Sequence, residues 1–295
     1  MKLLLLGKSG QVGWELQRAL APLGEVTALG RDAADFNRTE LLGPLVAAEQ
    51  PDVIVNAAAD TGVDQAEADP DRAMRVNGTA VGELAEAAAH TGALLVHYST
   101  DYVFGEDGTD QPHAETDPTG PLSVYGKTKR AGELAIEQSG CTALVLRTSW
   151  VYAARGRNFV RTILRLAGER SELKIVSDQV GAPTGAELIA DVTALAIAKV
   201  RAGQAAPGLY HLAAAGSTTW FDFARHIARR AGEFRAPLSC PVDAIRPLTT
   251  AEYGARAPRP LNSRLDTSKL RTAFEVRLPA WEQGVDRTLA ELLGS

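Results

Sequence analysis

The chain has 295 residues, of which 45% are hydrophobic and 23% charged, with a net charge of −5 and a pI near 5.6. This length can supply a large core, and the acidic balance offers no basic field for a nucleic acid. Its two cysteines, Cys141 and Cys240, form no metal-binding or redox motif. The apolar start ends at Gly7, too early for a signal peptide or a membrane span. We therefore expect a cytoplasmic protein with no nucleic-acid or membrane partner.

A glycine-rich turn follows the first predicted strand, Lys2–Leu6, and precedes a helical pattern. Gly7 permits a tight turn, Gly10 lets the backbone approach a pyrophosphate, and Gly13 lets the helix pack on the strand. The helix N-terminus then offers free N–H groups to an anion. The spacing is G-x-x-G-x-x-G rather than G-x-G-x-x-G, and it lacks the Gly-Lys-Ser/Thr of a P-loop. The turn predicts a dinucleotide site.

The second predicted strand, Glu25–Leu29, ends where dinucleotide-binding units usually place an acid for the adenosine ribose. This chain has Gly30 there, followed by Arg31. Glycine removes a clash with a 2′-phosphate and arginine can pair with one, so NADPH is favoured over NADH, which stays open. Asp35 and Phe36 follow, within expected reach of an adenine.

Two further βα units extend the pattern. The predicted strand Asp52–Val55 is followed by a helix over Asp71–His90, and Leu94–Tyr98 is the fourth strand. Repeated units of this kind predict a parallel sheet that binds ligands at the carboxyl ends of its strands. Small residues after the third strand would let a flat cofactor approach the backbone: Ala57, Ala58 and Ala59, with Asp60 and Thr61 next.

The fourth strand and the next helix carry the candidate catalytic groups. The strand delivers Thr100 at its end, a loop is expected over Gly105–Pro121, and the helix that follows carries Tyr125 and Lys129. Residues four apart share a helix face. A tyrosine with an ordinary pKa near ~10 can protonate a reduced ketone if a neighbouring ammonium lowers that pKa. Thr100 would orient the substrate oxygen.

After residue 155 the alternation loosens into mixed elements. Helices are expected over Asn158–Leu166, Glu187–Val200, Thr218–Ala231 (capped by Ser217 or Thr218) and Trp281–Leu293, with a loop over Gln179–Gly185 and a strand over Gly208–Leu212. We predict an α/β protein with a Rossmann-like, doubly wound parallel sheet in residues 1–150 and a smaller α/β substrate lobe in residues 151–295. Some segments of the second half are expected to return to the first.

Several side chains outside the trio have expected positions. Trp150 would cover a substrate ring, and Arg256 and Arg259 could grip a diphosphate. His97 is expected inside the fourth strand as a satisfied interior histidine, whereas His113 and His226 are expected at the surface.

Together these motifs resemble the extended short-chain dehydrogenases/reductases that act on nucleotide sugars, and within them the dTDP-4-dehydrorhamnose reductase family. The segments that carry the resemblance span most of the chain: Gly7–Leu16, Ser99–Phe104, Arg147–Tyr152, Gly181–Gly185 and Arg259–Leu265. The resemblance implies reduction of dTDP-4-dehydro-β-L-rhamnose to dTDP-L-rhamnose with NAD(P)H, the last step in making that sugar nucleotide.

The resemblance also implies roles for particular residues. Tyr125 would be the proton donor, Lys129 its modulator and Thr100 the third catalytic member. Tyr125 and Lys129 would also contact the cofactor, and Lys129 would hold the nicotinamide ribose. Gly10, Gln11 and Val12 would hold pyrophosphate, and Asp35, Phe36, Ala59, Asp60 and Thr61 would line the cofactor. Thr100, Asp101 and Trp150 would contact the dTDP-sugar, and we place Tyr102, Asn158 and Arg259 on the same side.

Some relatives form a dimer around Mg²⁺ held by glutamates. The matching positions are Glu15, Glu187 and Glu291. Carboxylate oxygens suit that ion, but spacing alone is equally compatible with three solvated helix residues. A magnesium-bridged homodimer is thus an expectation from resemblance only.

Other functions share this fold. A 4,6-dehydratase needs an acid directly after Asp101, where this chain has Tyr102. An epimerase, a different nucleotide-sugar 4-ketoreductase, and a non-catalytic cofactor-binding subunit like the regulatory subunit of methionine adenosyltransferase stay open. The intact trio favours a reductase.

Overall fold

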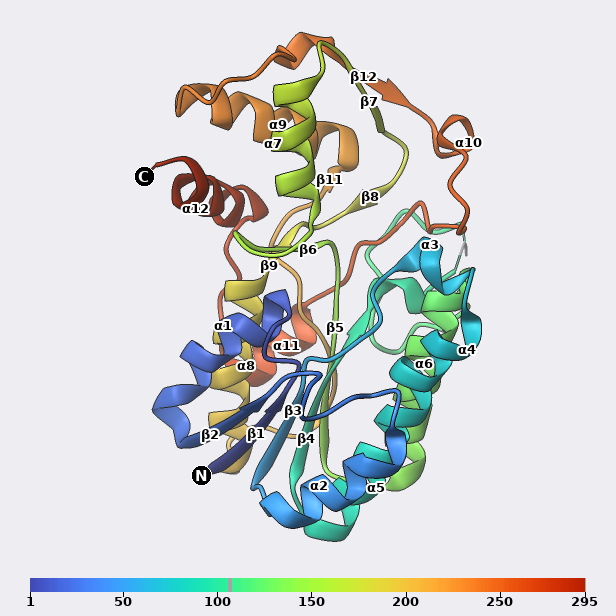
Figure 1. The fold of residues 1–295 in the computed structure, drawn as a ribbon, viewed down its shortest axis with the longest axis vertical. Helices are drawn as coiled ribbons and strands as arrows, with labels where there is room; N and C mark the ends of the chain where they lie inside the picture. Colours follow the sequence, from blue (N-terminus) through green and yellow to red (C-terminus); the bar gives the residue numbers. More distant parts are fainter. Residues whose placement is uncertain (106–107, 295) are drawn as a thin grey trace.

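The computed structural model describes residues 1–105 and 108–294, so residues 106 and 107 of the predicted loop lie outside the described part. Its centre is a parallel sheet with the strand order β10-β5-β4-β3-β1-β2 (Figure 1). The predicted Rossmann-like α/β class is confirmed. The strands are β1 (Lys2–Leu6), β2 (Glu25–Leu29), β3 (Val53–Asn56), β4 (Leu94–Thr100), β5 (Ala143–Thr148) and β10 (Gly208–His211).

Helices cover both faces of this sheet, because its inner strands are apolar on both sides. Leu3 and Leu5 enter one core and Leu4 and Leu6 the other, as alternation along a strand requires. Figure 1 shows one helical layer on each side of the sheet. The first layer contains α1 (Gln11–Leu20), α8 (Ala186–Arg201) and α11 (Ser268–Phe274); the second contains α2 (Leu42–Glu49), α5 (Ala80–Thr91) and α6 (Val124–Ser139).

The second half of the chain contributes to the central sheet with its helices, and it also forms a separate group of elements. Its strand β10 pairs with β5, and Ile189 and Ile197 of α8 share a core with Leu16 of α1. The remaining elements gather at the carboxyl end of the sheet (Figure 1). They are β6 (Val151–Tyr152), α7 (Phe159–Glu169), β7 (Leu173–Val176), β8 (Val180–Gly181), β9 (Thr184–Gly185), β11 (Thr218–Thr219), α9 (Trp220–Glu233), β12 (Ile245–Leu248), α10 (Thr250–Tyr253) and α12 (Trp281–Leu293).

These elements form a lobe with a core of its own. Ile163 of α7, Phe223 and Ile227 of α9, and Val285 and Leu289 of α12 are buried together. Among the described residues, no helix combines the length and the apolar composition needed to cross a membrane.

The helix expected over Asp71–His90 is confirmed: it runs without a break from α4 (Pro70–Met74) through a π-helical turn (Arg75–Thr79) into α5. Two other predicted elements need correction. The loop expected over Gln179–Gly185 contains β8 and β9. The helix expected from Thr218 begins at Trp220 with Thr219 as its cap, because Thr218 pairs with Gly181 in a short sheet.

Candidate active site

The glycine turn between β1 and α1 is shaped for close backbone approach. Gly7 has a φ of 85°, and a Cβ there would lie 2.7 Å from the Ala58 nitrogen. A Cβ on Gly13 would lie 2.1 Å from the Gly7 oxygen, so only glycine lets α1 pack this tightly. Helix α1 begins after Gly10 without a side-chain cap, which leaves N–H groups available for an anion.

A cleft of about 220 Å³ opens beside this turn. Its lining includes many of the residues predicted to hold the cofactor, namely Gly7, Gly10, Arg31, Asp35, Phe36, Ala57, Ala58, Ala59 and Asp60. Gln11, Val12, Gly13 and Thr61 lie next to it in sequence but do not line it. The small residues and the uncapped helix fit a flat, anionic dinucleotide.

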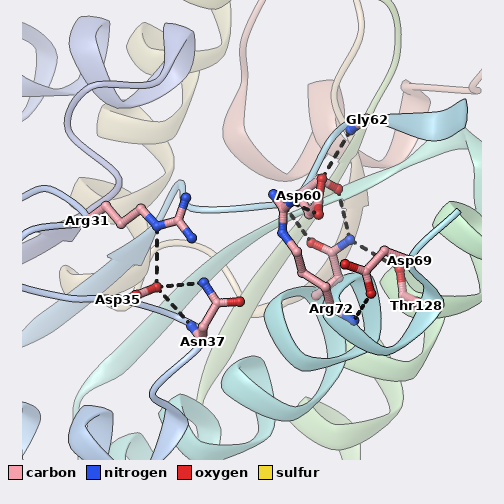
Figure 2. Close-up of polar contacts among 9 residues, drawn as sticks. Arg31, Asp35, Asn37, Asp60, Gly62, Asp69, Arg72 and Thr128 are labelled. Atoms are coloured by element: carbon pink, nitrogen blue, oxygen red, sulfur yellow. Dashed lines mark hydrogen bonds and ion pairs between the residues drawn. The ribbon is translucent and has the colours of Figure 1, made fainter. Parts of the chain in front are cut away.

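Arg31 and Asp35 meet in this cleft (Figure 2). Arg31 Nε lies 3.4 Å from Asp35 Oδ1, which also accepts hydrogen bonds from the backbone and side-chain amides of Asn37 at 3.0 and 2.8 Å. These hydrogen bonds lower the pKa of Asp35, and the bond from the Asn37 backbone has the largest effect. The Arg31 side chain remains 68% exposed, so its other donors are accessible.

Asp60 links the cofactor cleft to the catalytic helix through Asn77. The Asn77 amide accepts from Asp60 N and donates to Asp60 O, each at 2.9 Å, and also donates to Thr128 of α6 at 3.1 Å. Figure 2 shows Arg72 beside Asp60, and that ion pair spans 3.3 Å. Sequence reasoning assigned no role to Asn77 or Arg72; an asparagine inside an alanine-rich helix was the available signal.

Thr100, Asp101 and Tyr125, which the sequence predicts to take part in catalysis, lie together; the place they share is called the catalytic pocket below. Thr100 Oγ1 donates to Asp101 Oδ1 at 3.0 Å, and Tyr125 hydrogen-bonds Thr100. Since the threonine hydroxyl has a single proton, Tyr125 is the donor in that bond. Burial raises the pKa of Asp101 to about 6, and burial together with the charges of Asp101 and Asp60 raises the pKa of Tyr125.

Lys129 lies on the same helix, and its side chain bonds to strand β4. Its Nζ donates to the Tyr98 carbonyl oxygen at 2.6 Å and lies 3.2 Å from His97 Nε2. Burial lowers the pKa of Lys129 to about 8, and the Glu133 charge partly offsets this effect. The expected lowering of the Tyr125 pKa is not found: burial raises this pKa, and the Lys129 nitrogen is engaged by the Tyr98 carbonyl and His97.

Tyr102 and Arg259 close the other side of the pocket. The Tyr102 ring packs edge-on against Tyr125, with centroids 5.6 Å apart. Arg259 hydrogen-bonds Tyr102, and its Nη2 lies 2.8 Å from Asp64 Oδ2. Asp64 therefore fixes an arginine predicted to face the substrate, and sequence reasoning did not identify this carboxylate. Arg256 also lies near Asp64, whose pKa it helps to lower.

Trp150 and Asn158 have defined surroundings. Trp150 stacks on Trp220 with centroids 3.6 Å apart and has a φ of 48°. A Cβ on Gly181 would lie 2.5 Å from the Trp150 ring, so glycine is required there. Asn158 caps α7 and donates to Gln11 Oε1 at 2.8 Å, which joins the lobe to the glycine turn.

The three glutamates predicted to hold Mg²⁺ line a common cavity of about 260 Å³. Burial and the charges of Glu187 and Glu291 raise the pKa of Glu15, whereas Glu187 also pairs with Arg287 at 3.2 Å. Nevertheless, no three carboxylate, histidine or cysteine groups within residues 1–105 and 108–294 are placed to hold a metal ion. The three glutamates of a single chain do not fit a magnesium site.

His97 is buried as expected, but the prediction for His113 was wrong. His113 is 1% exposed and stacks on Phe104 with centroids 4.2 Å apart. Its backbone pairs with the 264–266 segment of the lobe, which covers it. That long-range pairing is not visible in the local sequence. His226 is half-buried rather than exposed, since it contacts Asp286 at 2.8 Å.

A parallel sheet, a glycine turn shaped for a dinucleotide, and a threonine–tyrosine–lysine set at the carboxyl edge define a Rossmann-type oxidoreductase of the short-chain class. Comparisons with known proteins narrow this class to one family. The family model described as RmlD substrate binding domain matches residues 1–293.

Named relatives agree with the family model over the whole chain. The dTDP-4-dehydrorhamnose reductase of Escherichia coli is 49% identical, covering 99% of this chain and 98% of the relative. That of Burkholderia thailandensis is 51% identical and covers 99% of each. The solved structure of the Bacillus anthracis reductase in complex with NADP is 32% identical, with a TM-score of 0.87 and coverage of 98% and 99%. The chain belongs to the dTDP-4-dehydrorhamnose reductase family.

Proposed function

We propose that this protein reduces the 4-keto group of dTDP-4-dehydro-β-L-rhamnose to give dTDP-L-rhamnose, with NAD(P)H as the reductant. Near-50% identity to named reductases over the full chain is the observation that carries this proposal. The Thr100–Tyr125 pair supports it, because the pair offers a hydroxyl proton at the strand end where a substrate carbonyl would lie.

Each catalytic side chain has a distinct task in this proposal. NAD(P)H supplies the hydride when it is bound. Tyr125 gives its proton to the new alkoxide, and Thr100 turns its hydroxyl from Asp101 to the substrate oxygen. Lys129 would hold the nicotinamide ribose, and its ammonium would favour the tyrosinate that Tyr125 becomes after it gives up its proton. Tyr102 and Trp150 enclose the sugar and exclude water, and Arg259, held by Asp64, pairs with the diphosphate.

We infer a preference for NADPH. Arg31 lines the cofactor cleft with most of its side chain exposed, where a guanidinium can pair with a 2′-phosphate. The NADP-bound relative supports this choice. Comparing KM for NADPH and NADH tests it, and equal values would contradict it.

The assay for the main proposal measures NAD(P)H oxidation with the 4-keto sugar nucleotide, followed by chromatography of the product. Stoichiometric consumption of cofactor and formation of dTDP-L-rhamnose are expected. Turnover without net cofactor consumption would indicate an epimerase, and cofactor binding without turnover would indicate a regulatory subunit.

The magnesium-bridged homodimer stays a prediction. The shared cavity of Glu15, Glu187 and Glu291 supports a second chain completing the ligand set, since one chain does not supply it. Sedimentation in Mg²⁺ and in EDTA tests this. The prediction requires a dimer that dissociates when the ion is removed, and a metal-independent mass would contradict it.

A further inference from the structure

A cavity of about 1160 Å³ lies outside both the cofactor cleft and the catalytic pocket. It is bounded by the segment 264–267, by α11 and the segment 276–280 that leads to α12, and by the segment 214–217. Of the described residues that form its walls, none also lines the cofactor cleft and none belongs to the catalytic pocket. Small-molecule sites typically measure about 300–1,000 Å³, so the space is ample for a ligand of nucleotide size.

The walls of this cavity carry an excess of positive charge. Arg264, Arg271 and Arg277 line it, and it is called the arginine cavity below. Among the described lining residues, Asp266 is the only acidic one. Asp266 Oδ1 accepts the Ser268 N–H at 2.8 Å, and the hydrogen bonds from Ser268 lower the pKa of this carboxyl. Three arginines against one aspartate favour an anionic ligand, although the whole chain has a net charge of −5.

The protein itself does not neutralise these three guanidinium groups. In the described part of the chain, none of the ion pairs includes Arg264, Arg271 or Arg277. Arg264 donates to uncharged oxygens, namely Asn262 Oδ1 at 2.9 Å and a backbone carbonyl. Arg271 donates to Ser268 Oγ at 3.1 Å, whereas the side chain of Arg277 has no hydrogen-bond partner among the described residues. Arg271 and Arg277 are exposed, so their free N–H groups can reach a ligand.

The other walls of the arginine cavity suit a nucleotide better than a bare inorganic anion. Leu265 and Leu278 are 8% and 5% exposed, and they offer an apolar surface that a base or a sugar ring can cover. Ser217 and Gln283 also line the cavity, and neither side chain is hydrogen-bonded to a described residue. Ser217 is free because Thr219, rather than Ser217, caps α9. A few polar groups beside apolar surface are typical of small-molecule sites.

We propose that the arginine cavity is a second binding site, for a nucleotide that carries a diphosphate or triphosphate group. Arg271 and Arg277 would hold the phosphates, because a guanidinium can donate two parallel N–H bonds to phosphate oxygens. The base and the sugar would cover the apolar surface beside Leu265. This site is separate from the places proposed for the reductant and the dTDP-sugar, and it does not depend on the proposed reaction.

Hydrogen–deuterium exchange of the full chain with ATP as the probe tests where the nucleotide binds. ATP should slow exchange in two separate places, the glycine turn of the cofactor cleft and the segments 264–267 and 276–280. Changing both Arg271→Gln and Arg277→Gln should abolish protection at the arginine cavity and keep it at the glycine turn. Protection confined to the glycine turn of the wild type would overturn the proposal.

Equilibrium dialysis of radiolabelled ATP measures the affinity. The wild type should bind two nucleotides per chain, and Arg271→Gln with Arg277→Gln should weaken one of them by about tenfold or more through loss of charge-assisted bonds. Arg170→Gln with Arg246→Gln is the matched control, because it removes two exposed arginines of the lobe that lie outside the cavity walls. An equal loss in this control would show general charge attraction and would contradict a defined site.

A second variant keeps the test valid if the double arginine variant does not fold. Gln283→Trp places a large side chain at an exposed position of the cavity wall and leaves all three arginines in place. It should also abolish protection of the segments 264–267 and 276–280, and unchanged protection would overturn the proposal. Binding of ATP at the arginine cavity in a protein that does not reduce the sugar would support this site and count against the proposed function alone.

Discussion

The cofactor cleft and the catalytic pocket lie at the same edge of one sheet but are built in different ways. The cleft is formed by small residues and backbone, and Asp35 and Asp60 there are paired with Arg31 and Arg72. In the pocket, by contrast, Asp101 and Lys129 are buried and Tyr125 is half-buried, and desolvation is the largest cause of each pKa shift. Binding thus depends on shape and charge pairing, whereas the chemistry depends on desolvated groups.

The largest expected effect comes from the pocket. Tyr125→Phe removes the proton donor and should lower kcat by ~10²–10⁴-fold, while the Kd for NADPH stays unchanged because the cleft is untouched. Stopped-flow kinetics and fluorescence titration measure the two quantities. Tyr210→Phe, at a buried tyrosine of β10, is the matched control and should leave kcat unaltered. A Tyr125→Phe enzyme with the wild-type rate would remove this residue from the mechanism.

The buried lysine should make stability depend on pH. The pKa of Lys129 is about 8 in the folded protein against an ordinary 10.5, so between these values the unfolded chain binds the proton more readily. Relative to Lys129→Met, the wild type should therefore lose stability as pH falls from 10.5 to 8, by up to about 3 kcal/mol. Urea unfolding across this range measures the difference.

Exposed Lys127, two residues earlier on α6, provides the control for this pH dependence. Lys127→Met should show no pH-dependent difference from the wild type. If the difference in unfolding free energy between the wild type and Lys129→Met does not change with pH, the amine is not desolvated. The pocket would then not differ from the cleft in this respect.

The smallest expected effect comes from the cleft. Arg31→Ala should raise KM for NADPH roughly tenfold through loss of one charge-assisted pair, and should leave KM for NADH unchanged. Arg38→Ala, at a similarly exposed arginine paired with Glu40, should change neither value. Equal effects of Arg31→Ala on both cofactors would assign Arg31 to general folding.

The contrast also explains which features the sequence could predict. Local turn geometry predicts the roles of Gly7 and Gly13. Strand order predicts that Thr100 and Tyr125 come together, and they form a hydrogen bond. Asn77 and Asp64 act through partners 17 and 195 residues away. No local pattern reports such contacts.

The sequence was least informative about the direction and surroundings of side chains. Helix periodicity places Lys129 and Tyr125 on one face, but the Tyr98 carbonyl and His97 decide where the amine lies. The same limit applies to His113. Its local sequence predicts an exposed position, but the lobe segment around Leu265 pairs with it. A short strand such as β8 is defined by its pairing with a distant segment, here Gly181 with Thr218. Its own sequence therefore predicts a loop.

The most direct test of the reductase assignment follows the hydride itself. NADPH carrying deuterium at carbon 4 of the nicotinamide is incubated with the 4-keto sugar nucleotide, and the product is examined by NMR and mass spectrometry. One deuterium at carbon 4 of the sugar is expected for each NADPH oxidised when the label is on the transferred face of the nicotinamide, and none when it is on the opposite face. Product without deuterium from both labelled cofactors, or conversion of the sugar with NADPH unconsumed, would contradict the reductase assignment.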